Sequence, residues 1–412
     1  MHIVYFHQHF STPEGAAGIR SYYMARAAID EGHEVTMVCG SYHNGYTGLD
    51  GPYRRGRRSG IVDGIRVIEF NLEYSNKDGF VKRSVTFAKF AMNSIWLALS
   101  LKYDLIFATT TPLTTCLPGI FARWIRRKPF VFEVRDLWPE IPREMGVIKN
   151  PVVLGLMSAL EWASYRSATR LIALSPGIAK GIERRGVSGD RIALIPNGCD
   201  LKIFNEEQTE AWRPEGILDE QLLVVFTGTH GQANGLDSVL DAALELKNKG
   251  RKDISIVLIG DGKLKPELMS RSKKQELDNV IFLDPVPKER LAQLMAAADL
   301  GLQCLANVPA FYYGTSPNKF FDYIAAGLPV LNNYPGWLAD MILQEQCGFV
   351  VAPDEPAEFA NALERAADDR KALVSMGNRS SELAQRDFDR AILARKWIAW
   401  VAGSVKLDET VS

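Results

Sequence analysis

The chain has 412 residues, with an apolar content of 47% and a charged content of 24%, which are the proportions of a globular protein. Its length predicts two or three domains. Its five cysteines are scattered and do not have the spacing of a metal site or a redox motif, which favours a reducing compartment. Residues 1–200 carry 25 Lys and Arg against 18 Asp and Glu, whereas the remainder carries 23 against 31. The basic half indicates an anionic partner such as a phospholipid surface or a diphosphate, or else an uneven scatter of solvated charge. No nucleic-acid module is recognisable in the sequence, so we expect no nucleic-acid partner.

The first forty residues predict a strand, a loop, a helix and a second strand, as at the start of a Rossmann-like domain. Residues 2–6 are expected to be an apolar strand and not a signal peptide. The loop glycines, Gly15 and Gly18, do not form the G-x-G-x-x-G fingerprint, which disfavours an oxidoreductase that binds a dinucleotide. His7 and His9 have a spacing that can bind zinc, but no third ligand cluster is visible, and we expect no metal site.

Two later segments of this half leave alternatives open. Residues 42–64, rich in Gly, Tyr and Arg, predict a long mobile loop whose basic run either contacts phosphate or is solvated. Residues 82–101 predict a helix with a mostly uncharged run of about eighteen residues, which Lys89 interrupts. We expect this helix either to be buried or to rest one face on a bilayer, and not to span the membrane.

Arg135, Asp136 and Trp138 follow directly on a predicted buried strand, residues 129–133. Ligands of open α/β sheets bind at the carboxyl ends of the strands, so these three side chains are placed for function. The alternative is a structural role, in which Arg135 pairs with Asp136 or Glu133.

The second half of the chain is organised around residues 316–333. Ser316 is predicted to cap a helix whose N-terminus then carries the amides of Asn318 and Lys319. Such a helix end binds anions, and the ammonium of Lys319 adds a full positive charge there. A carboxylate beside an anion site, on Asp322, suits the hydroxyl groups of a ribose. The alternative is an ordinary capped helix with solvated charges.

This stretch resembles the nucleotide-binding helix of the retaining glycosyltransferases of the GT-B fold, family 4. That family places a carboxylate, more often Glu than the Asp322 found here, on the donor ribose just before an Ala-Ala-Gly-x-Pro-Val turn, here residues 325–330. Residues 195–200, Ile-Pro-Asn-Gly-Cys-Asp, closely resemble the hinge segment of the family. Residues 133–139 resemble its bacterial surface-polysaccharide branch, of the fucosamine-transferase type, which glycosylates lipid-linked sugars.

The resemblance implies an α/β protein with two facing Rossmann-like domains. The acceptor domain would cover residues 1–204, the nucleotide-sugar domain residues 219–386, and a tail helix, residues 387–412, would cross back to the first domain. The reaction would be a retaining transfer, without a metal or other cofactor, from a nucleotide-sugar to a sugar on polyprenyl diphosphate, with uridine favoured as the base. Such an enzyme would be cytoplasmic and would bind peripherally to the inner face of the bacterial plasma membrane. Another GT-B enzyme, such as a nucleotide-sugar epimerase or hydrolase, and a non-catalytic nucleotide-sugar-binding protein stay open as alternatives.

The resemblance also assigns roles to individual residues. The residues expected to bind the donor are Gly18, Gly228, Thr229, Asn234, Val286, Gly314, Thr315, Ser316, Asn318, Lys319 and Asp322. The residues expected to bind the acceptor are Arg20, Arg135, Asp136 and Trp138, of which Arg135 and Asp136 are also expected to be catalytic. Three positions depart from the family, because Thr229 and Asn234 replace its usual Arg and Lys, and Gly314 replaces a second Glu. We expect Lys319 to supply part of the missing positive charge.

Overall fold

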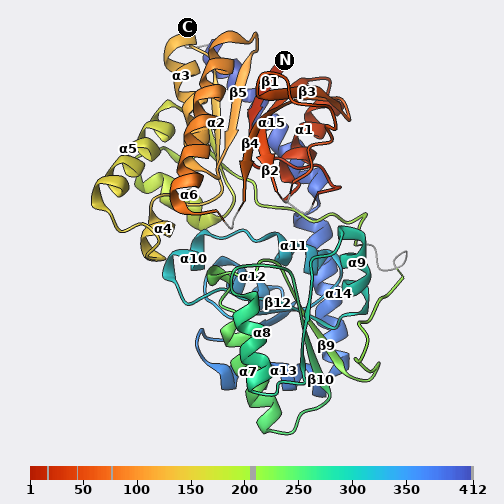
Figure 1. Ribbon diagram of the computed structural model, residues 1–412. Coiled ribbons are helices and arrows are strands. Elements are labelled where there is room, and N and C mark those ends of the chain that lie inside the picture. The colour runs from red at the N-terminus through yellow and green to blue at the C-terminus, as the bar shows by residue number, and fades with distance from the viewer. Residues whose placement is uncertain (16–17, 44, 76–77, 205–209, 410–412) are drawn as a thin grey trace. The chain divides into compact units, whose positions relative to one another are not determined.

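The computed structural model describes residues 1–412 except 16–17, 44, 76–77, 205–209 and 410–412 (Figure 1). The described chain forms two compact units. Unit 1 comprises Met1–Pro196, Gly314–Ser316 and Ala391–Ser412, and unit 2 comprises Asn197–Tyr313 and Pro317–Arg390. The domain limits at residues 204, 219 and 386 stay predictions.

Unit 1 is built on an eight-stranded sheet in the order β3-β4-β2-β1-β5-β6-β7-β8. Its strands are β1 (His2–Phe6), β2 (Glu34–Tyr42), β3 (Arg57–Val62), β4 (Ile65–Tyr74), β5 (Leu105–Thr109), β6 (Phe130–Val134), β7 (Arg170–Ala173) and β8 (Ile192–Leu194). Its helices are α1 (Arg20–Asp30), α2 (Phe80–Ser100), η1 (Leu113–Cys116), α3 (Leu117–Arg126), α4 (Glu140–Glu144), α5 (Pro151–Ser167), α6 (Pro176–Arg184), η2 (Gly189–Arg191) and α15 (Arg390–Glu409). Neighbouring strands pair in parallel except β3 and β4, which are antiparallel.

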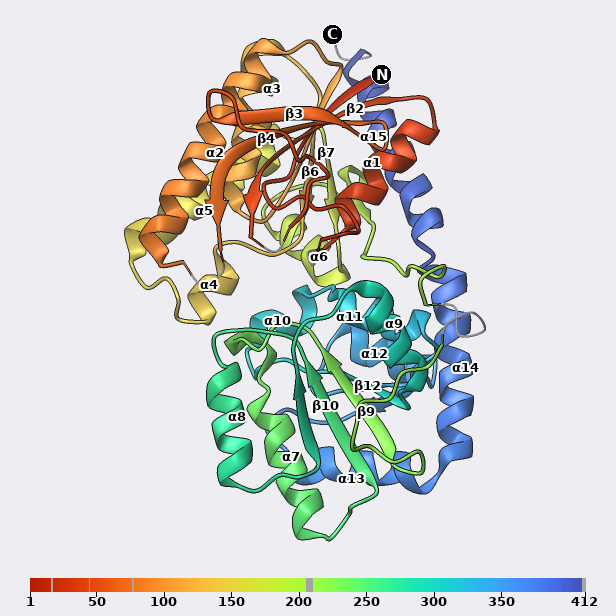
Figure 2. The same ribbon diagram turned by 45° about the vertical axis from the view of Figure 1, so that its right-hand side comes forward.

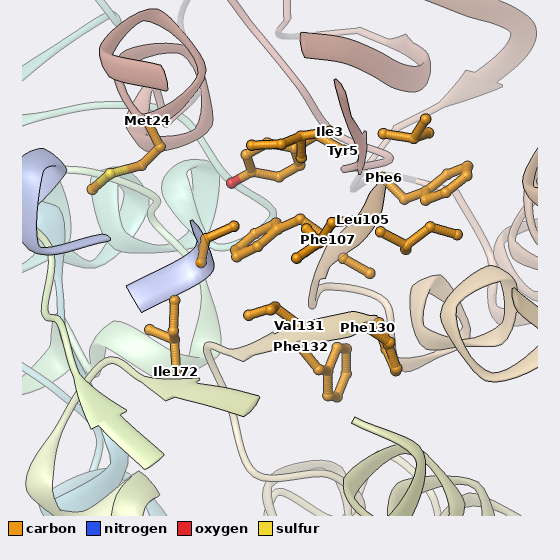
Figure 3. Close-up of a cluster of buried hydrophobic side chains, with 14 of the residues drawn as sticks. Ile3, Tyr5, Phe6, Met24, Leu105, Phe107, Phe130, Val131, Phe132 and Ile172 are labelled. Carbon is orange, nitrogen blue, oxygen red and sulfur yellow. The ribbon is translucent and has the colours of Figure 1, made fainter. Parts of the chain in front are cut away.

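The central strands of unit 1 are apolar along their length because helices cover both faces of the sheet (Figure 2). On one face Tyr5 and Phe107 lie side by side (Figure 3), with ring centroids 4.4 Å apart. Both rings contact Trp397 of α15, at centroid distances of 5.9 and 4.9 Å. Trp397 is fully buried, so the tail helix completes the core of unit 1. The predicted return of the chain to its first domain is therefore confirmed.

Part of the segment predicted to be a mobile loop is a strand. β3 pairs with β4 so that Arg58 lies opposite Glu69, and the two side chains form an ion pair with a distance of 2.8 Å. Glu69 is buried, so the guanidinium of Arg58 compensates a charge inside the unit. For this part of residues 42–64 the prediction was wrong, and Arg58 is neither a solvated residue nor free for a phosphate.

Unit 2 is a wholly parallel, six-stranded sheet in the order β11-β10-β9-β12-β13-β14. Its strands are β9 (Leu222–Thr227), β10 (Ile254–Ile259), β11 (Val280–Leu283), β12 (Leu300–Gln303), β13 (Val330–Asn332) and β14 (Gly348–Val350). Its helices are η4 (Gln232–Asn234), α7 (Asp237–Asn248), α8 (Lys265–Lys274), α9 (Lys288–Ala297), α10 (Pro309–Gly314), α11 (Asn318–Ala325), α12 (Trp337–Gln344), α13 (Pro356–Asp368) and α14 (Arg370–Asp387).

Both sheets are doubly wound, which confirms the predicted α/β class. In unit 2 the order of the strands reverses between β9 and β12, and in unit 1 it reverses between β1 and β5. Ligands of such sheets bind outside the carboxyl ends of the strands at this switch point. Each unit therefore has one place, defined by its topology, where a ligand is expected.

Candidate active site

Helix α11 is the element that the sequence analysis placed at the centre of the site, and it forms as predicted. Its apolar residues Phe320, Phe321 and Ile324 recur at helical spacing and are fully buried. Gly327 follows the helix with a φ of 69°, a left-handed conformation that ends the helix and turns the chain towards β13. The apolar side of α11 thus anchors the helix, and its first residues are left to interact with a ligand.

The first turn of α11 differs from the prediction in one respect. Asn318 is the first helical residue and Pro317 is the N-cap, with no hydrogen bond from a capping side chain. The prediction that Ser316 caps the helix is therefore wrong, because the chain enters the helix one residue later. Proline has no side-chain acceptor, so the N-cap residue itself supplies no partner for the amides at the start of the helix.

The ammonium group of Lys319 is the main charge at this end of α11. Its Nζ donates to Oδ1 of Asn234 at 2.7 Å and lies 4.0 Å from the centre of the Phe226 ring. The amide of Asn234 in turn donates to the backbone carbonyl of Thr229 at 2.6 Å. Gly228, with a φ of 136°, passes so close that a Cβ at this position would lie 3.5 Å from Nζ. Burial lowers the pKa of Lys319 to about 7.

The structure thus brings together four of the residues predicted to bind a donor, and it explains one departure from the family. An amide oxygen at position 234 accepts a hydrogen bond from the Lys319 ammonium. A lysine at this position would place a second positive charge against Lys319 at short range, where repulsion is strong. An asparagine at position 234 is therefore electrostatically compatible with Lys319, whereas a lysine there would be repelled.

Asp322 has a partner that the sequence analysis missed. Its buried carboxylate accepts two hydrogen bonds from Nζ of Lys288, at 2.9 and 3.1 Å. Lys288 is the first residue of α9, and Val286, which is predicted to bind the donor, lies half-buried two residues before it. In the sequence, Lys288 is marked only by its position shortly after the end of β11. A hydroxyl group that reaches Asp322 would meet a carboxylate and an ammonium together.

The remaining residues predicted to bind the donor belong to unit 1. Gly18 is exposed just before α1 and follows residues 16–17, which lie outside the described residues. Gly314 is the buried last residue of α10, and Thr315 and Ser316 follow it half-buried. Their contacts with a donor stay predictions.

The carboxylate of Glu133, fully buried at the end of β6, organises the site in unit 1. Arg20 donates to it from Nη2 at 2.9 Å and from Nε at 3.1 Å. Arg135 donates from Nε at 3.3 Å, and Thr109 donates from Oγ1 at 2.8 Å. Burial alone would raise the pKa of this carboxyl, but the two guanidinium groups outweigh it and hold the pKa below its ordinary value. Glu133 is therefore an ionised group inside the unit.

Arg20 has structural partners that the sequence analysis did not predict. Besides Glu133, its guanidinium donates to the backbone carbonyls of Ile195, at 2.8 Å, and Pro196. Arg20 is only 5% exposed, and these bonds direct its donors into the unit. It is a structural cation that compensates Glu133, and its contact with an acceptor stays a prediction.

Arg135 forms one of the two structural pairs that the sequence left open. Its Nε pairs with Glu133, whereas its Nη2 is buried and has no hydrogen-bond partner among the described residues. Asp136 accepts a hydrogen bond from Thr111 at 3.2 Å, and burial raises the pKa of its carboxyl. The indole Nε1 of Trp138 likewise has no partner in the described part of the chain. The acceptor-binding and catalytic roles of these residues stay predictions.

Two glycosyltransferase domains match the sequence, one in each unit. Residues 15–198 match the family model of a glycosyl transferase 4-like domain, and residues 221–369 match that of the glycosyl transferases group 1. The chain belongs to the GT-B glycosyltransferases. The resemblance seen in the sequence is confirmed at this level, and the fucosamine-transferase-like branch stays a prediction.

The D-inositol 3-phosphate glycosyltransferase of Nocardia farcinica is 30% identical to this GT-B protein over 222 residues, which are 52% of this chain and 48% of the relative. The chain spans about half the length of the curated relatives it matches. In fold it is similar to Anabaena Alr3699/HepE in complex with UDP and glucose, with a TM-score of 0.66, 19% identity, and 98% and 100% of the two chains covered. It is also similar to WaaG, a glycosyltransferase involved in lipopolysaccharide biosynthesis, with a TM-score of 0.69, 18% identity, and 97% and 100% covered.

We predict that Arg20→Met destabilises unit 1 of this GT-B protein by about 3–5 kcal/mol, because it leaves the Glu133 carboxylate buried without its main cation. The double variant Arg20→Met/Glu133→Gln should recover a large part of this loss, since a neutral amide needs no cation. Urea unfolding followed by tryptophan fluorescence measures both free energies of unfolding. A double variant as unstable as the single one would show that Arg20 stabilises the unit by packing and not through charge.

Proposed function

We propose that this chain is a retaining glycosyltransferase, which moves a sugar from a UDP-linked donor to a sugar carried on polyprenyl diphosphate. The reaction would be a step in the assembly of a bacterial surface glycan. The donor would bind to unit 2 and the acceptor to unit 1. The observation that carries the proposal is the arrangement at α11, where an ammonium group, helix amides and a carboxylate–ammonium pair surround the start of one helix.

The diphosphate of the donor fits the surroundings of Lys319. The ammonium group and the first amides of α11 supply positive charge, and Gly228 allows a phosphate to approach the backbone closely. The ribose fits the pair of Asp322 and Lys288, because a hydroxyl can donate to the carboxylate and accept from the ammonium. The solved complex of Alr3699/HepE with UDP supports uridine as the base.

The chemistry we propose needs no metal and no protein base. The bond between C1 of the sugar and the diphosphate oxygen breaks while the acceptor oxygen bonds to C1 from the same face. The proton of the acceptor hydroxyl passes to the leaving phosphate oxygen. Lys319 and the amides of α11 would stabilise the charge that develops on the diphosphate. Arg135 and Asp136 would orient the acceptor hydroxyl or stabilise the charge on the sugar.

One face of unit 1 supports a lipid-linked acceptor. Helices α2, α3 and α5 pack beside one another over the sheet (Figure 1). Together they expose large apolar side chains, namely Met92, Trp96, Leu99, Phe121, Trp124, Ile125, Val152, Leu156 and Trp162. Lys89 and Arg166 are exposed on the same helices. The three helices contain one carboxylate, that of Glu161, and it is buried.

An apolar face that is flanked by basic groups and lacks exposed carboxylates suits the surface of an anionic bilayer. Among the described residues, no helix is both long enough and apolar enough to cross a membrane. We therefore propose that the α2–α3–α5 face rests on the inner face of the plasma membrane. The structure of WaaG, a protein of lipopolysaccharide biosynthesis, supports the assignment to surface-glycan assembly.

A screen of nucleotide-sugars against lipid-linked and free acceptors tests the proposed activity. We expect transfer from a UDP-sugar to an acceptor on polyprenyl diphosphate, with retained anomeric configuration by NMR and full activity in EDTA. Donor consumption without an acceptor would instead indicate a hydrolase or an epimerase. Equal transfer to a free, water-soluble sugar would overturn the lipid-linked acceptor, and activity lost in EDTA but restored by magnesium would overturn the metal-free chemistry.

The pKa of Lys319 predicts how nucleotide binding depends on pH. A bound diphosphate favours the charged ammonium, so the pKa must rise above its free value of about 7 on binding. Above pH 7 binding therefore takes up a proton, and the affinity for UDP should fall by up to about tenfold per pH unit. Calorimetry between pH 7 and 9, in buffers of different ionisation enthalpy, measures both effects.

The variant Lys319→Gln should lose this pH dependence and bind UDP about tenfold or more weakly at pH 7. Lys371→Gln, which removes an exposed lysine at the start of α14, is the matched control and should change neither quantity. Binding by Lys319→Gln with the affinity and pH dependence of the wild type would exclude Lys319 from the donor site.

Exposed side chains test the membrane contact without disturbing the core. The triple variant Met92→Ser/Ile125→Ser/Leu156→Ser, with one change on each of the three helices, should lower partitioning onto anionic phospholipid vesicles by about tenfold or more. Ile61→Ser/Leu343→Ser/Val374→Ser is the control, since these residues are similarly exposed on β3, α12 and α14. Equal vesicle binding by both triple variants in a flotation assay would contradict the proposed face.

A further inference from the structure

The carboxyl end of β1 carries a cluster of polar side chains that the proposed mechanism does not use. His7, Gln8 and His9 follow β1 directly, and β2 and β5 lie on either side of that strand. His7 and Gln8 are 3% and 1% exposed, and His9 is half-buried. The cluster therefore lies at the switch point of unit 1, where a doubly wound sheet binds its ligand.

Most of the polar side-chain atoms in this cluster have no partner. Nδ1 of His7, Oε1 and Nε2 of Gln8, and Nε2 of His9 are buried and form no hydrogen bond with any described residue. Buried polar atoms in proteins are nearly always paired. Four unpaired atoms on three consecutive residues at a ligand-binding edge therefore point to a molecule that pairs with them.

The chemistry of the cluster suits hydroxyl groups. Burial, assisted by nearby guanidinium charge, lowers the pKa of His7 well below its ordinary value and that of His9 to about 3. Both imidazoles are therefore neutral at physiological pH, and each has one donor and one acceptor nitrogen. The amide of Gln8 also donates and accepts. A sugar hydroxyl can use both functions, whereas a phosphate only accepts and would leave Oε1 of Gln8 unpaired.

The surroundings hold these side chains in place. The rings of Tyr42 and Tyr74 pack on His9, with centroid distances of 5.1 and 4.4 Å. Gly40 lies against Gln8, whose Cγ is 3.6 Å from the position that a Cβ at Gly40 would occupy. Side chains that are fixed before a ligand arrives lose little conformational entropy on binding.

A further donor follows β6, which is the second strand from β1 in the sheet. Nη2 of Arg135 has no partner among the described residues, and the charge of Arg135 contributes to the lowered pKa of both imidazoles. We propose that His7, Gln8 and His9, together with Arg135, form the subsite that binds the hydroxyl groups of the acceptor sugar. This inference rests on the proposed function, and it assigns the cluster to the neutral sugar ring and not to the diphosphate.

The variant Gln8→Met tests the subsite, because it replaces the amide by an apolar side chain of similar length. Since the side-chain amide of Gln8 bonds to no described residue, the variant should unfold at the temperature of the wild type or above it. The KM for the acceptor should rise by about tenfold or more, and the KM for the donor should stay unchanged. His7→Leu should have the same effects and serves as the second variant.

Two glutamines provide controls. Gln303 is buried at the end of β12, and its amide donates to Tyr334 at 3.1 Å, so Gln303→Met should lower the unfolding temperature. Gln385 is exposed on α14, and Gln385→Met should change neither the stability nor the KM for the acceptor. A comparison of Gln303→Met with Gln8→Met therefore distinguishes an amide that stabilises the protein from one that binds a ligand.

Direct binding separates this inference from the proposed transfer. Titration of the full chain with the methyl α-glycosides of N-acetylglucosamine and of galactose should give saturable binding that weakens about tenfold in Gln8→Met, even if no donor is turned over. An unchanged acceptor KM in both variants overturns the subsite but leaves the transferase standing. The absence of glycoside binding to the wild type also overturns the subsite. So does a lower unfolding temperature of Gln8→Met with unchanged acceptor constants. Either result would indicate that the cluster binds buried water.

Discussion

Unit 1 depends on the compensation of one buried charge. The carboxylate of Glu133 lies where water cannot reach it, and an ionised group in such a place is tolerated only with cations and donors around it. Arg20 from α1 and Thr109 from β5 donate hydrogen bonds to this carboxylate. Arg20 also donates to the backbone that follows β8. A single carboxylate thus connects the first helix to the central strands and to the backbone that follows β8, and it also forms an ion pair with Arg135 after β6.

The fold was predictable because parallel sheets have a plain sequence pattern. Short apolar runs such as residues 254–259, buried on both faces, alternate with amphipathic helices, which is the pattern typical of a parallel α/β sheet. The strand β3 has no such pattern, since its residues alternate between exposed and half-buried positions. Its pairing depends on Arg58 and Glu69, which meet across two strands, and a local pattern of residues does not contain that contact.

The site was predictable where neighbours in sequence are neighbours in space. Helix α11, with Lys319 and Asp322 on its first turns, could be derived from residues 316–333 alone. Lys288 was missed because it reaches Asp322 from another element, and the pairing of Arg20 with Glu133 was missed because the two residues are distant in the sequence. Gln8 carries no signal in the sequence, since what distinguishes it is that its side-chain amide has no partner in the described structure.

The path of the chain through unit 1 has a consequence for the order of folding. The aromatic pocket of Tyr5 and Phe107 closes only when Trp397 arrives, and Val401 of the same helix is also fully buried. Unit 2, whose last residue is Arg390, can complete its own sheet earlier during synthesis. The unit that begins the chain is therefore the last to finish folding, and until then its central strands keep an uncovered apolar surface that is prone to aggregation.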